Sequence, residues 1–269
     1  MDLSDIQAKR YSRHIILKEI GFEGQVRLTS GSVLIVGCGG LGSPIAMYLA
    51  SAGIGTIGLV DADNVDITNL QRQIVHFTPD VDKPKVESAE EKIRMINPDV
   101  KTVLYTEYLK ATNAAEIIGK YDFVIDATDN FPAKYLINDA CVLLKKPFSH
   151  AGILRFEGQT FTYTPGSTCL RCLFPEPPPE GVVPTCSQAG VLNTLPGVMG
   201  TIQATEAVKY ISGAGDLLTD RVLMFDAMKM RFHTVSTDKD HSCPVCGSDP
   251  AIKELYDEVQ KPCTDKKDV

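Results

Sequence analysis

The sequence lacks several features that mark large classes of proteins. It has no stretch of about 20 apolar residues, so no membrane-spanning helix and no membrane partner are predicted. The acidic start, residues 1–5, has no apolar segment typical of a secretory signal, so we expect a soluble, cytoplasmic protein. Basic runs are absent and the net charge is −7, which disfavours nucleic-acid binding and confines phosphate recognition to a local site. Internal repeats are also absent.

What is present suffices for a substantial core. The 269 residues, 43% of them hydrophobic, allow one large domain or two small ones. Eight cysteines in a protein without an export signal indicate metal or redox chemistry rather than disulfides.

Apolar runs alternate with helical patterns through the first half of the chain. Strands are expected at 32–36, 56–61, 103–105 and 123–126, with helices at 41–52, 83–96 and 112–119. This alternation predicts an α/β fold with a doubly wound, mostly parallel, Rossmann-like sheet. An antiparallel C-terminal extension is predicted from a strand at 156–163, a helix at 194–212 and strands at 221–226 and 230–236. The flanking segments are expected to be a helical arm at 5–30, a mobile proline-rich loop at 175–181 and a loose tail at 247–269.

The loop Gly37-Cys38-Gly39-Gly40-Leu41-Gly42 is the strongest functional motif. It follows an apolar strand and opens a helix, so Gly37, Gly39, Gly40 and Gly42 allow the backbone to approach a phosphate at the helix N-terminus. Asp61, 19 residues past Gly42, has the spacing of a carboxylate that holds ribose hydroxyls. Both features fit NAD and ATP equally well, and a glycine turn without a ligand is the simpler alternative.

Polar residues after the second strand favour ATP. Asn69, Arg72 and Gln73 follow that strand, and Lys85 lies in the first turn of the next helix. Helix N–H groups serve the paired phosphates of a dinucleotide, whereas added cations suit a triphosphate whose transfer develops charge. Each residue alone is commonly a solvated surface position, so the argument depends on their clustering.

The segment Asp126-Ala127-Thr128-Asp129-Asn130 ends the strand at 123–126. Two carboxylates and an amide at a strand end are suited to hold Mg²⁺ through oxygen. A helix N-cap formed by Asp129 or Asn130 is the simpler alternative, and the two roles are compatible.

Two C-x-x-C pairs, Cys169/Cys172 and Cys243/Cys246, predict a tetrahedral Cys₄ zinc site. The gap of 70 residues between them means that the metal would join two remote segments, and four thiolates leave no position open for catalysis. His241 is a less favoured substitute ligand. Cys186 belongs to neither pair and is either a nucleophilic thiol or an inert cysteine.

Taken together, these motifs resemble those of the bacterial ubiquitin-activating-like adenylyltransferases, the ThiF, MoeB and HesA group. The resemblance spans about residues 5–246 and includes Arg10-Tyr11-Ser12-Arg13, the glycine loop, Asp61-Ala62-Asp63, Asn69-Leu70-Gln71-Arg72-Gln73, Lys83-Pro84-Lys85, the segment 126–130, Thr185-Cys186 and both cysteine pairs. It implies a homodimer that uses ATP and Mg²⁺. Its substrate would be a ubiquitin-like sulfur-carrier protein of the thiamine or molybdopterin type, whose C-terminal Gly-Gly is adenylated with release of pyrophosphate.

The resemblance also implies a role for each matched position. The nucleotide would be held by the glycine loop, by Asp61 at the ribose, and by Asn69, Arg72 and Lys85 at the phosphates. Further nucleotide-binding positions would be Asp63, Leu70, Gln71 and Gln73. The metal and the reaction centre would be served by Asp129 and Asn130. Arg13 would contact the ATP that is bound by the partner subunit. Cys186 resembles the thiol that some members use in acyl or persulfide transfer.

The implied organisation is a single adenylation domain over residues 1–246 and a polar tail over 247–269. The nucleotide-binding half would span about 30–150, and the half that binds the carrier and zinc about 151–246. Residues 250–255 resemble the linker that leads to a rhodanese domain in longer relatives. The sequence here contains no such domain after the linker, so we expect the sulfur donor to be a separate protein.

Two other functions remain as alternatives. An NAD(P)-dependent oxidoreductase would explain the glycine loop and Asp61, but gives no reason for the segment 69–73, Asp129 or the cysteine pairs. A non-catalytic scaffold, stapled by zinc, would bind ubiquitin-like proteins without activating them.

Overall fold

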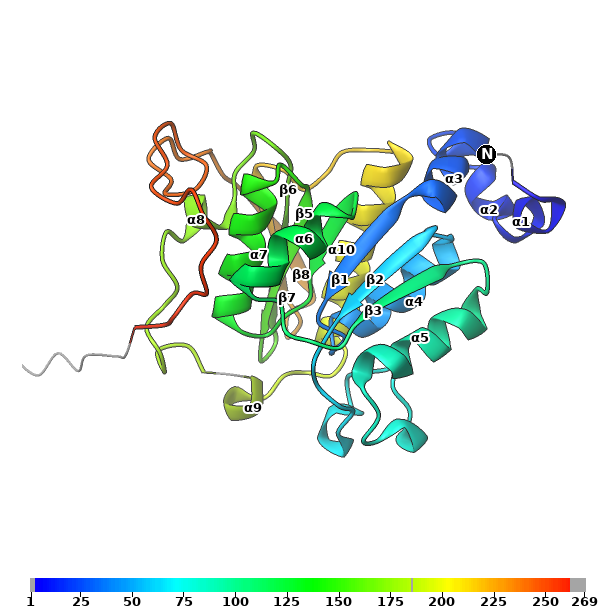
Figure 1. Cartoon of the computed structure of the whole chain (residues 1–269), viewed down its shortest axis with the longest axis horizontal. Helices are drawn as coiled ribbons and strands as arrows, with labels where there is room; N and C mark the ends of the chain where they lie inside the picture. Colours follow the sequence, from blue (N-terminus) through cyan, green and yellow to red (C-terminus); the bar gives the residue numbers. More distant parts are fainter. Residues whose placement is uncertain (1–2, 185, 262–269) are drawn as a thin grey trace, which may run out of the picture.

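The computed structural model describes residues 3–184 and 186–261, and its centre is one eight-stranded sheet (Figure 1). The strand order is β3-β2-β1-β4-β5-β6-β7-β8. Five strands are parallel: β1 (Ser32–Val36), β2 (Thr56–Val60), β3 (Lys101–Tyr105), β4 (Phe123–Asp126) and β5 (Phe148–Leu154). Three continue antiparallel: β6 (Glu157–Tyr163), β7 (Arg221–Asp226) and β8 (Arg231–Ser236). The predicted fold class is confirmed.

Helices cover both faces of the parallel part of the sheet (Figure 1). One face packs against α3 (Gly21–Ser30), α4 (Gly42–Ala52), α5 (Lys85–Ile96) and α10 (Leu195–Ser212), and the other against α6 (Ala111–Gly119) and α7 (Phe131–Leu143). Along β1, Val33 and Ile35 enter the first core, whereas Leu34 and Val36 enter the second. Burial on both faces explains why this strand is continuously apolar.

The order of the strands creates a switch point beside β1. The chain runs from β1 outward to β2 and β3, and then returns to β4 on the opposite side of β1. Open α/β sheets bind ligands in the crevice at the carboxyl ends of the strands, at this reversal. The glycine loop and the segment after β4 both lie there.

Strand β5 was not predicted from the sequence, and α7 was anticipated only as the helix that Asp129 or Asn130 would cap. Most of α7 is buried, from Lys134 to Cys141, so it lacks the one-sided apolar pattern by which a surface helix is recognised. In β5 the polar residues Ser149 and His150 are buried and hydrogen-bonded, which hides the strand from a search for apolar runs.

The N-terminal arm is three helices: α1 (Asp5–Arg10), α2 (Ser12–Ile15) and α3. The arm packs against the end of the sheet where the strands begin. Two hydrogen bonds show this: Arg10 donates to the carbonyl of Ile96 at the end of α5, and Gln7 donates to Asp99 just before β3. Figure 1 shows the arm at the end of the sheet where β1 begins.

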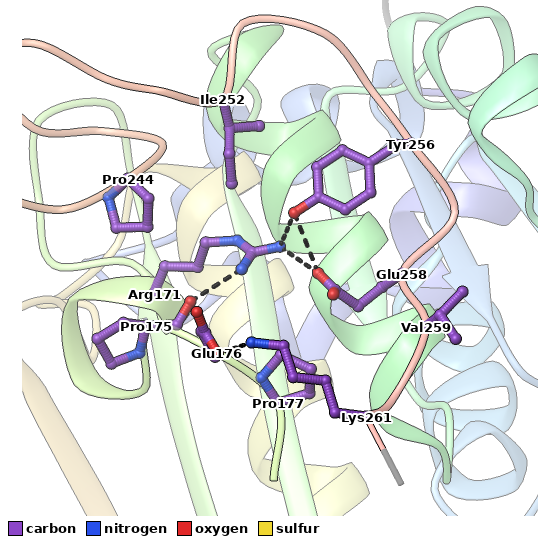
Figure 2. A pocket seen from close by; sticks show the side chains of 10 residues that line it. All are labelled: Arg171, Pro175, Glu176, Pro177, Pro244, Ile252, Tyr256, Glu258, Val259 and Lys261. Atoms are coloured by element: carbon purple, nitrogen blue, oxygen red, sulfur yellow. Dashed lines mark hydrogen bonds and ion pairs between the residues drawn. The ribbon is translucent and has the colours of Figure 1, made fainter. Parts of the chain in front are cut away.

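The expectation of a loose tail is wrong for residues 252–261, which pack against the proline-rich loop (Figure 2). Arg171 of α8 (Leu170–Leu173) is buried and pairs with Glu258 as well as with Asp139 of α7. Lys261 pairs with Glu176 of the loop at 2.7 Å, and a cavity of about 380 Å³ remains between the two segments. The buried guanidinium of Arg171 thus pairs with Glu258, which lies 87 residues away in the sequence, and no local pattern predicts such a pair.

The described helices include none that is both long enough and apolar enough to cross a bilayer.

The close packing of α10 against α4 can be tested at Gly200. A Cβ there would lie 2.6 Å from the carbonyl oxygen of Leu41, so Gly200→Ala should lower the free energy of unfolding by about 1–3 kcal/mol. Gly197 on the same helix has no heavy atom within 4 Å of its Cβ position, and Gly197→Ala should raise stability by about 0.5–1 kcal/mol. Urea unfolding measures both, and equal stability of the two variants would contradict the packing described.

Candidate active site

The glycine loop, residues 37–42, lies between β1 and α4. Gly37 has a φ of +98°, and a Cβ there would lie 2.7 Å from the carbonyl oxygen of Ala127. A Cβ on Gly42 would lie 2.0 Å from the carbonyl oxygen of Gly37, so neither position tolerates a side chain. The loop therefore turns tightly into α4, whose leading N–H groups have no partner within the helix. An anion bound there would meet these groups and the positive end of the helix dipole.

Asp61 and His76 hold this loop from two sides. One carboxylate oxygen of Asp61 accepts the Cys38 N–H at 2.8 Å, and the other accepts the Asp63 N–H at 2.9 Å. His76 Nε2 donates to the Cys38 carbonyl oxygen at 2.9 Å. A carboxylate has about four acceptor sites, so Asp61 retains capacity for ribose hydroxyls.

Lys85 pairs with two acidic residues, Asp61 and Asp63. Its Nζ lies 2.8 Å from Asp63 Oδ2 and 3.9 Å from Asp61 Oδ1. Burial raises the pKa of Asp61, and the Lys85 charge opposes that rise. Partial burial also raises the pKa of Asp63, but hydrogen bonds from Lys85 and Tyr108 hold it below its usual value. The cation predicted to meet phosphate therefore lies at the site, paired with two carboxylates.

The segment after the 3₁₀ helix η1 (Ile67–Asn69) borders the glycine loop. Asn69 Oδ1 accepts from Gln73 Nε2 at 2.9 Å and from Arg72 Nη2 at 3.4 Å. Arg72 Cγ lies 3.6 Å from the Cβ position of Gly40, and Gln73 Nε2 lies 3.5 Å from that of Gly39. The structure therefore brings these three side chains to the loop, as expected. Of their neighbours, Leu70 is half-buried and Gln71 is exposed.

Asp126 is not available as a magnesium ligand. It is fully buried at the end of β4, and its carboxylate is bonded to Lys134, His150 and Thr128. A carboxylate enclosed in this way has no side open to a solvated metal ion. The expectation that both carboxylates of this segment reach a metal is therefore wrong for Asp126.

Asp129 and Asn130 remain at the surface of this segment. Asn130 Oδ1 accepts the Ala133 N–H at 2.9 Å and caps α7, as the simpler alternative predicted. Asp129 is exposed. The two residues before it approach the glycine loop, since the Ala127 carbonyl oxygen and the Thr128 nitrogen lie 2.7 and 3.3 Å from the Cβ position of Gly37.

Two predicted residues, Arg13 and Cys186, come from elements outside this cluster. Arg13 is exposed on α2, at the end of the sheet where the strands begin. Cys186 begins the short helix α9 (Cys186–Ala189), and its side chain lies outside the described part of the structure. Gly190, next to α9, accepts the N–H of Arg155 just past β5, so α9 lies at the carboxyl edge of the sheet.

The four cysteines of the two C-x-x-C pairs meet as predicted. Cys169 precedes α8 (Leu170–Leu173), which also contains Cys172, and the second pair lies after β8. The four sulfur atoms lie within 4.8 Å of one another, with 3.6 Å between Cys169 and Cys243 and 3.3 Å between Cys172 and Cys246. Zinc–thiolate bonds of about 2.3 Å in a tetrahedron place sulfurs about 3.8 Å apart, so the cluster fits a zinc ion.

Sequence reasoning missed the residues that support the site. His76 follows the segment 69–73 by three residues, which was the available signal. Tyr108, Lys134 and His150 reach the site from separate elements, and nothing in their local sequence marks them.

The open α/β sheet with a glycine loop at its switch point defines the Rossmann-like class of proteins. Within that class, the model of the ThiF family matches residues 11–245, and the chain belongs to the ThiF family.

Curated relatives match over nearly the whole chain. It is 48% identical over 247 residues to the SAMP-activating enzyme E1 of Haloferax volcanii, covering 92% of each chain. It is 44% identical over 254 residues to the sulfur carrier protein adenylyltransferase of Thermus thermophilus, covering 92% of this chain and 94% of that one. The adenylyltransferase and sulfurtransferase MOCS3 of Sus scrofa is 44% identical over 257 residues, and the match covers 95% of this chain and 56% of that relative.

The fold also matches solved structures. Crystalline MccB of E. coli with MccA-N7isoASN superimposes with a TM-score of 0.80 at 22% identity, covering 91% of this chain and 76% of that one. This likeness supports the fold.

The cysteine cluster predicts about one zinc per chain by elemental analysis. Cys246→Ser should lower that content and the melting temperature together, because the metal joins segments remote in sequence. Cys141→Ala changes a buried thiol outside the cluster and should leave the zinc content intact. Less than half an equivalent of zinc in carefully prepared wild-type protein would contradict this assignment.

Proposed function

We propose that this protein is an ATP-dependent adenylyltransferase that activates the C-terminal glycine of a ubiquitin-like sulfur-carrier protein. The observation that carries the proposal is the gathering of the glycine loop, Asp61, Arg72, Lys85 and the segment that bears Asp129 at one switch point. It is supported by the 44% identity to a sulfur carrier protein adenylyltransferase over nearly the whole chain.

ATP suits the site better than a dinucleotide. A nicotinamide cofactor would use the glycine loop and Asp61, but it needs no cations beside them. Arg72 and Lys85 flank the loop, and both suit the charge of a triphosphate. The Lys85 ammonium would exchange part of its pairing with Asp63 for phosphate oxygens.

The chemistry asks for positioning and cations rather than covalent help from the protein. A carboxylate is a poor electrophile because its leaving group would be oxide. When the carrier's terminal carboxylate oxygen attacks the α-phosphate, a mixed anhydride forms and pyrophosphate leaves. Arg72 and Lys85 would stabilise charge that grows on the phosphates. Mg²⁺, when bound, would neutralise further charge, and the exposed Asp129 with Asn130 beside it would hold it.

The active form in this proposal is a homodimer, with Arg13 of one protomer directed to the ATP of its partner. Within one chain Arg13 lies where the strands begin, whereas the glycine loop lies where β1 ends. The same arm exposes apolar Ile16 and Leu17, by 68% and 48%, which a second copy would cover. Supplied across the dimer, an arginine of this kind contributes roughly 10³- to 10⁵-fold in nucleotide hydrolases.

The sulfur step is assigned to a separate donor protein. Residues 252–261 pack against the proline-rich loop that would border the carrier's extended tail. Cys186, on α9 at the carboxyl edge of the sheet, is the thiol available for acyl or persulfide transfer. Whether the carrier serves thiamine, molybdopterin or another sulfur-containing product is decided by pull-down with each candidate ending in Gly-Gly.

Asp129→Ala should lower carrier-dependent ATP–pyrophosphate exchange roughly 10²- to 10³-fold, because the metal loses its exposed carboxylate. Asp122→Asn, at the opposite end of the same strand, should retain exchange. A carrier without its terminal glycine should support none. Full activity of Asp129→Ala would refute the catalytic assignment, and nicotinamide reduction without pyrophosphate release would favour the oxidoreductase.

Mixing Arg13→Ala with Asp129→Ala should restore exchange to about a quarter of the wild-type rate. Half of the randomly paired dimers are mixed, and one of their two sites then contains both side chains. Exchange measured after subunit mixing tests this. If no activity returns in verified mixed dimers, Arg13 acts within its own chain or not at all.

A further inference from the structure

Asp126 carries a buried charge that the proposed chemistry does not use. Its side chain has no exposed surface, and Lys134 Nζ lies 3.2 Å from Oδ2 and 3.4 Å from Oδ1. His150 Nδ1 donates to Oδ2 at 2.7 Å. Burial alone would raise the pKa of Asp126, but Lys134 and the hydrogen bond from His150 hold it well below its usual range. The carboxylate is therefore ionised at neutral pH and compensated by one cation.

The contact between Asp126 and Lys134 closes a ring of residues, 126–134, that contains Asp129. Asp126 stands at the start of the segment, and Lys134 lies in the first turns of the helix that follows it. Their ion pair joins the two ends. Inside the ring, Asp126 Oδ1 accepts both the N–H of Thr128 at 3.0 Å and its hydroxyl at 2.6 Å. Residues 127–130 are thus held at both ends and in the middle.

The ring is also tied to its surroundings. Lys134 Nζ donates to the carbonyl of Ala151 on β5 at 2.7 Å, and Gln203 of α10 donates to the Asp126 carbonyl at 2.9 Å. Gly37 of the glycine loop packs directly on the carbonyl of Ala127, inside the ring. A shift of this segment would therefore move Asp129 relative to the nucleotide loop.

We propose that Lys134, acting through Asp126, is a positioning residue that fixes Asp129 against the glycine loop for the adenylation step. The assignment rests on the function proposed above. Lys134 touches neither substrate nor phosphate in this role. Its effect is to hold the separation and orientation of two reacting groups, to which transition-state geometry is sensitive.

The role predicts a loss in turnover without a matching loss in nucleotide affinity. Lys134→Met keeps the length of the side chain and removes the charge. Its kcat for ATP–pyrophosphate exchange should fall about 100-fold, whereas the KM for ATP should change less than about threefold. The Thr128 amide should exchange its hydrogen faster, as measured on peptides that span residues 127–130. Lys134→Arg, which restores the cation, should recover at least about tenfold of the lost turnover.

A second variant guards against simple unfolding. The double variant Asp126→Asn, Lys134→Met removes both buried charges, so it avoids an uncompensated carboxylate while still opening the ring. It should fold and show the same loss of turnover. Lys209→Met is the matched control, because Lys209 pairs with the buried Glu206 at the far end of α10, away from the segment.

Each outcome decides the question. Normal turnover in folded Lys134→Met, or an equal loss in Lys209→Met, overturns the positioning role. A fall in affinity for ATP with unchanged kcat also overturns it. Wild-type protein that exchanges pyrophosphate with no carrier refutes the proposed function instead, and hydrogen exchange at 127–130 then still shows whether Lys134 orders the segment.

Discussion

The contact between Gly37 and the carbonyl of Ala127 is the constraint on which the site depends. It joins the loops that follow β1 and β4, the two strands that flank the switch point of the sheet. A side chain at Gly37 would separate them, because its Cβ would lie 2.7 Å from that carbonyl oxygen. The glycine loop and the loop that carries Asp129 therefore form one unit, and backbone packing sets the geometry between them.

Three aspartates surround this unit, and each is paired with a lysine; Asp80 and Asp126 are buried, and Asp61 is half-buried. Asp61 and Lys85 lie beside the Cys38 peptide, and Asp126 and Lys134 close the segment after β4. The third pair, Asp80 with Lys92, reaches the glycine loop through Ser88 and His76. Buried ion pairs contribute little net stability, because desolvation offsets their attraction. What these pairs do here is fix the positions of their side chains. A buried charge that moves away from its partner has neither solvent nor an opposite charge to stabilise it.

The C-terminal half is organised by different interactions, separate from the proposed chemistry. Four cysteines join α8 to the segment after β8, where the local sequence offers few apolar residues for packing. Arg171, which lies between Cys169 and Cys172 in the sequence, forms ion pairs with Asp139 of α7 and with Glu258 of the tail. The cysteine cluster and a buried guanidinium thus lie where the proline-rich loop meets the body of the protein. Nucleotide chemistry and structural support occupy different parts of one sheet.

The sequence by itself determined the elements whose signals are local. The apolar runs of β1 and β4, the glycine turn into α4 and the two C-x-x-C pairs each depend on neighbouring residues, and the structure contains these strands, this turn and the cysteine cluster. Only the tertiary structure decided which polar side chains are enclosed. It showed that Asp126 is enclosed by Lys134 and His150 and is therefore no candidate metal ligand, and that residues 252–261 pack against the body although their composition predicts a loose tail. The reason is physical: compensation of a buried charge depends on distance in space, and those partners come from other elements of the chain.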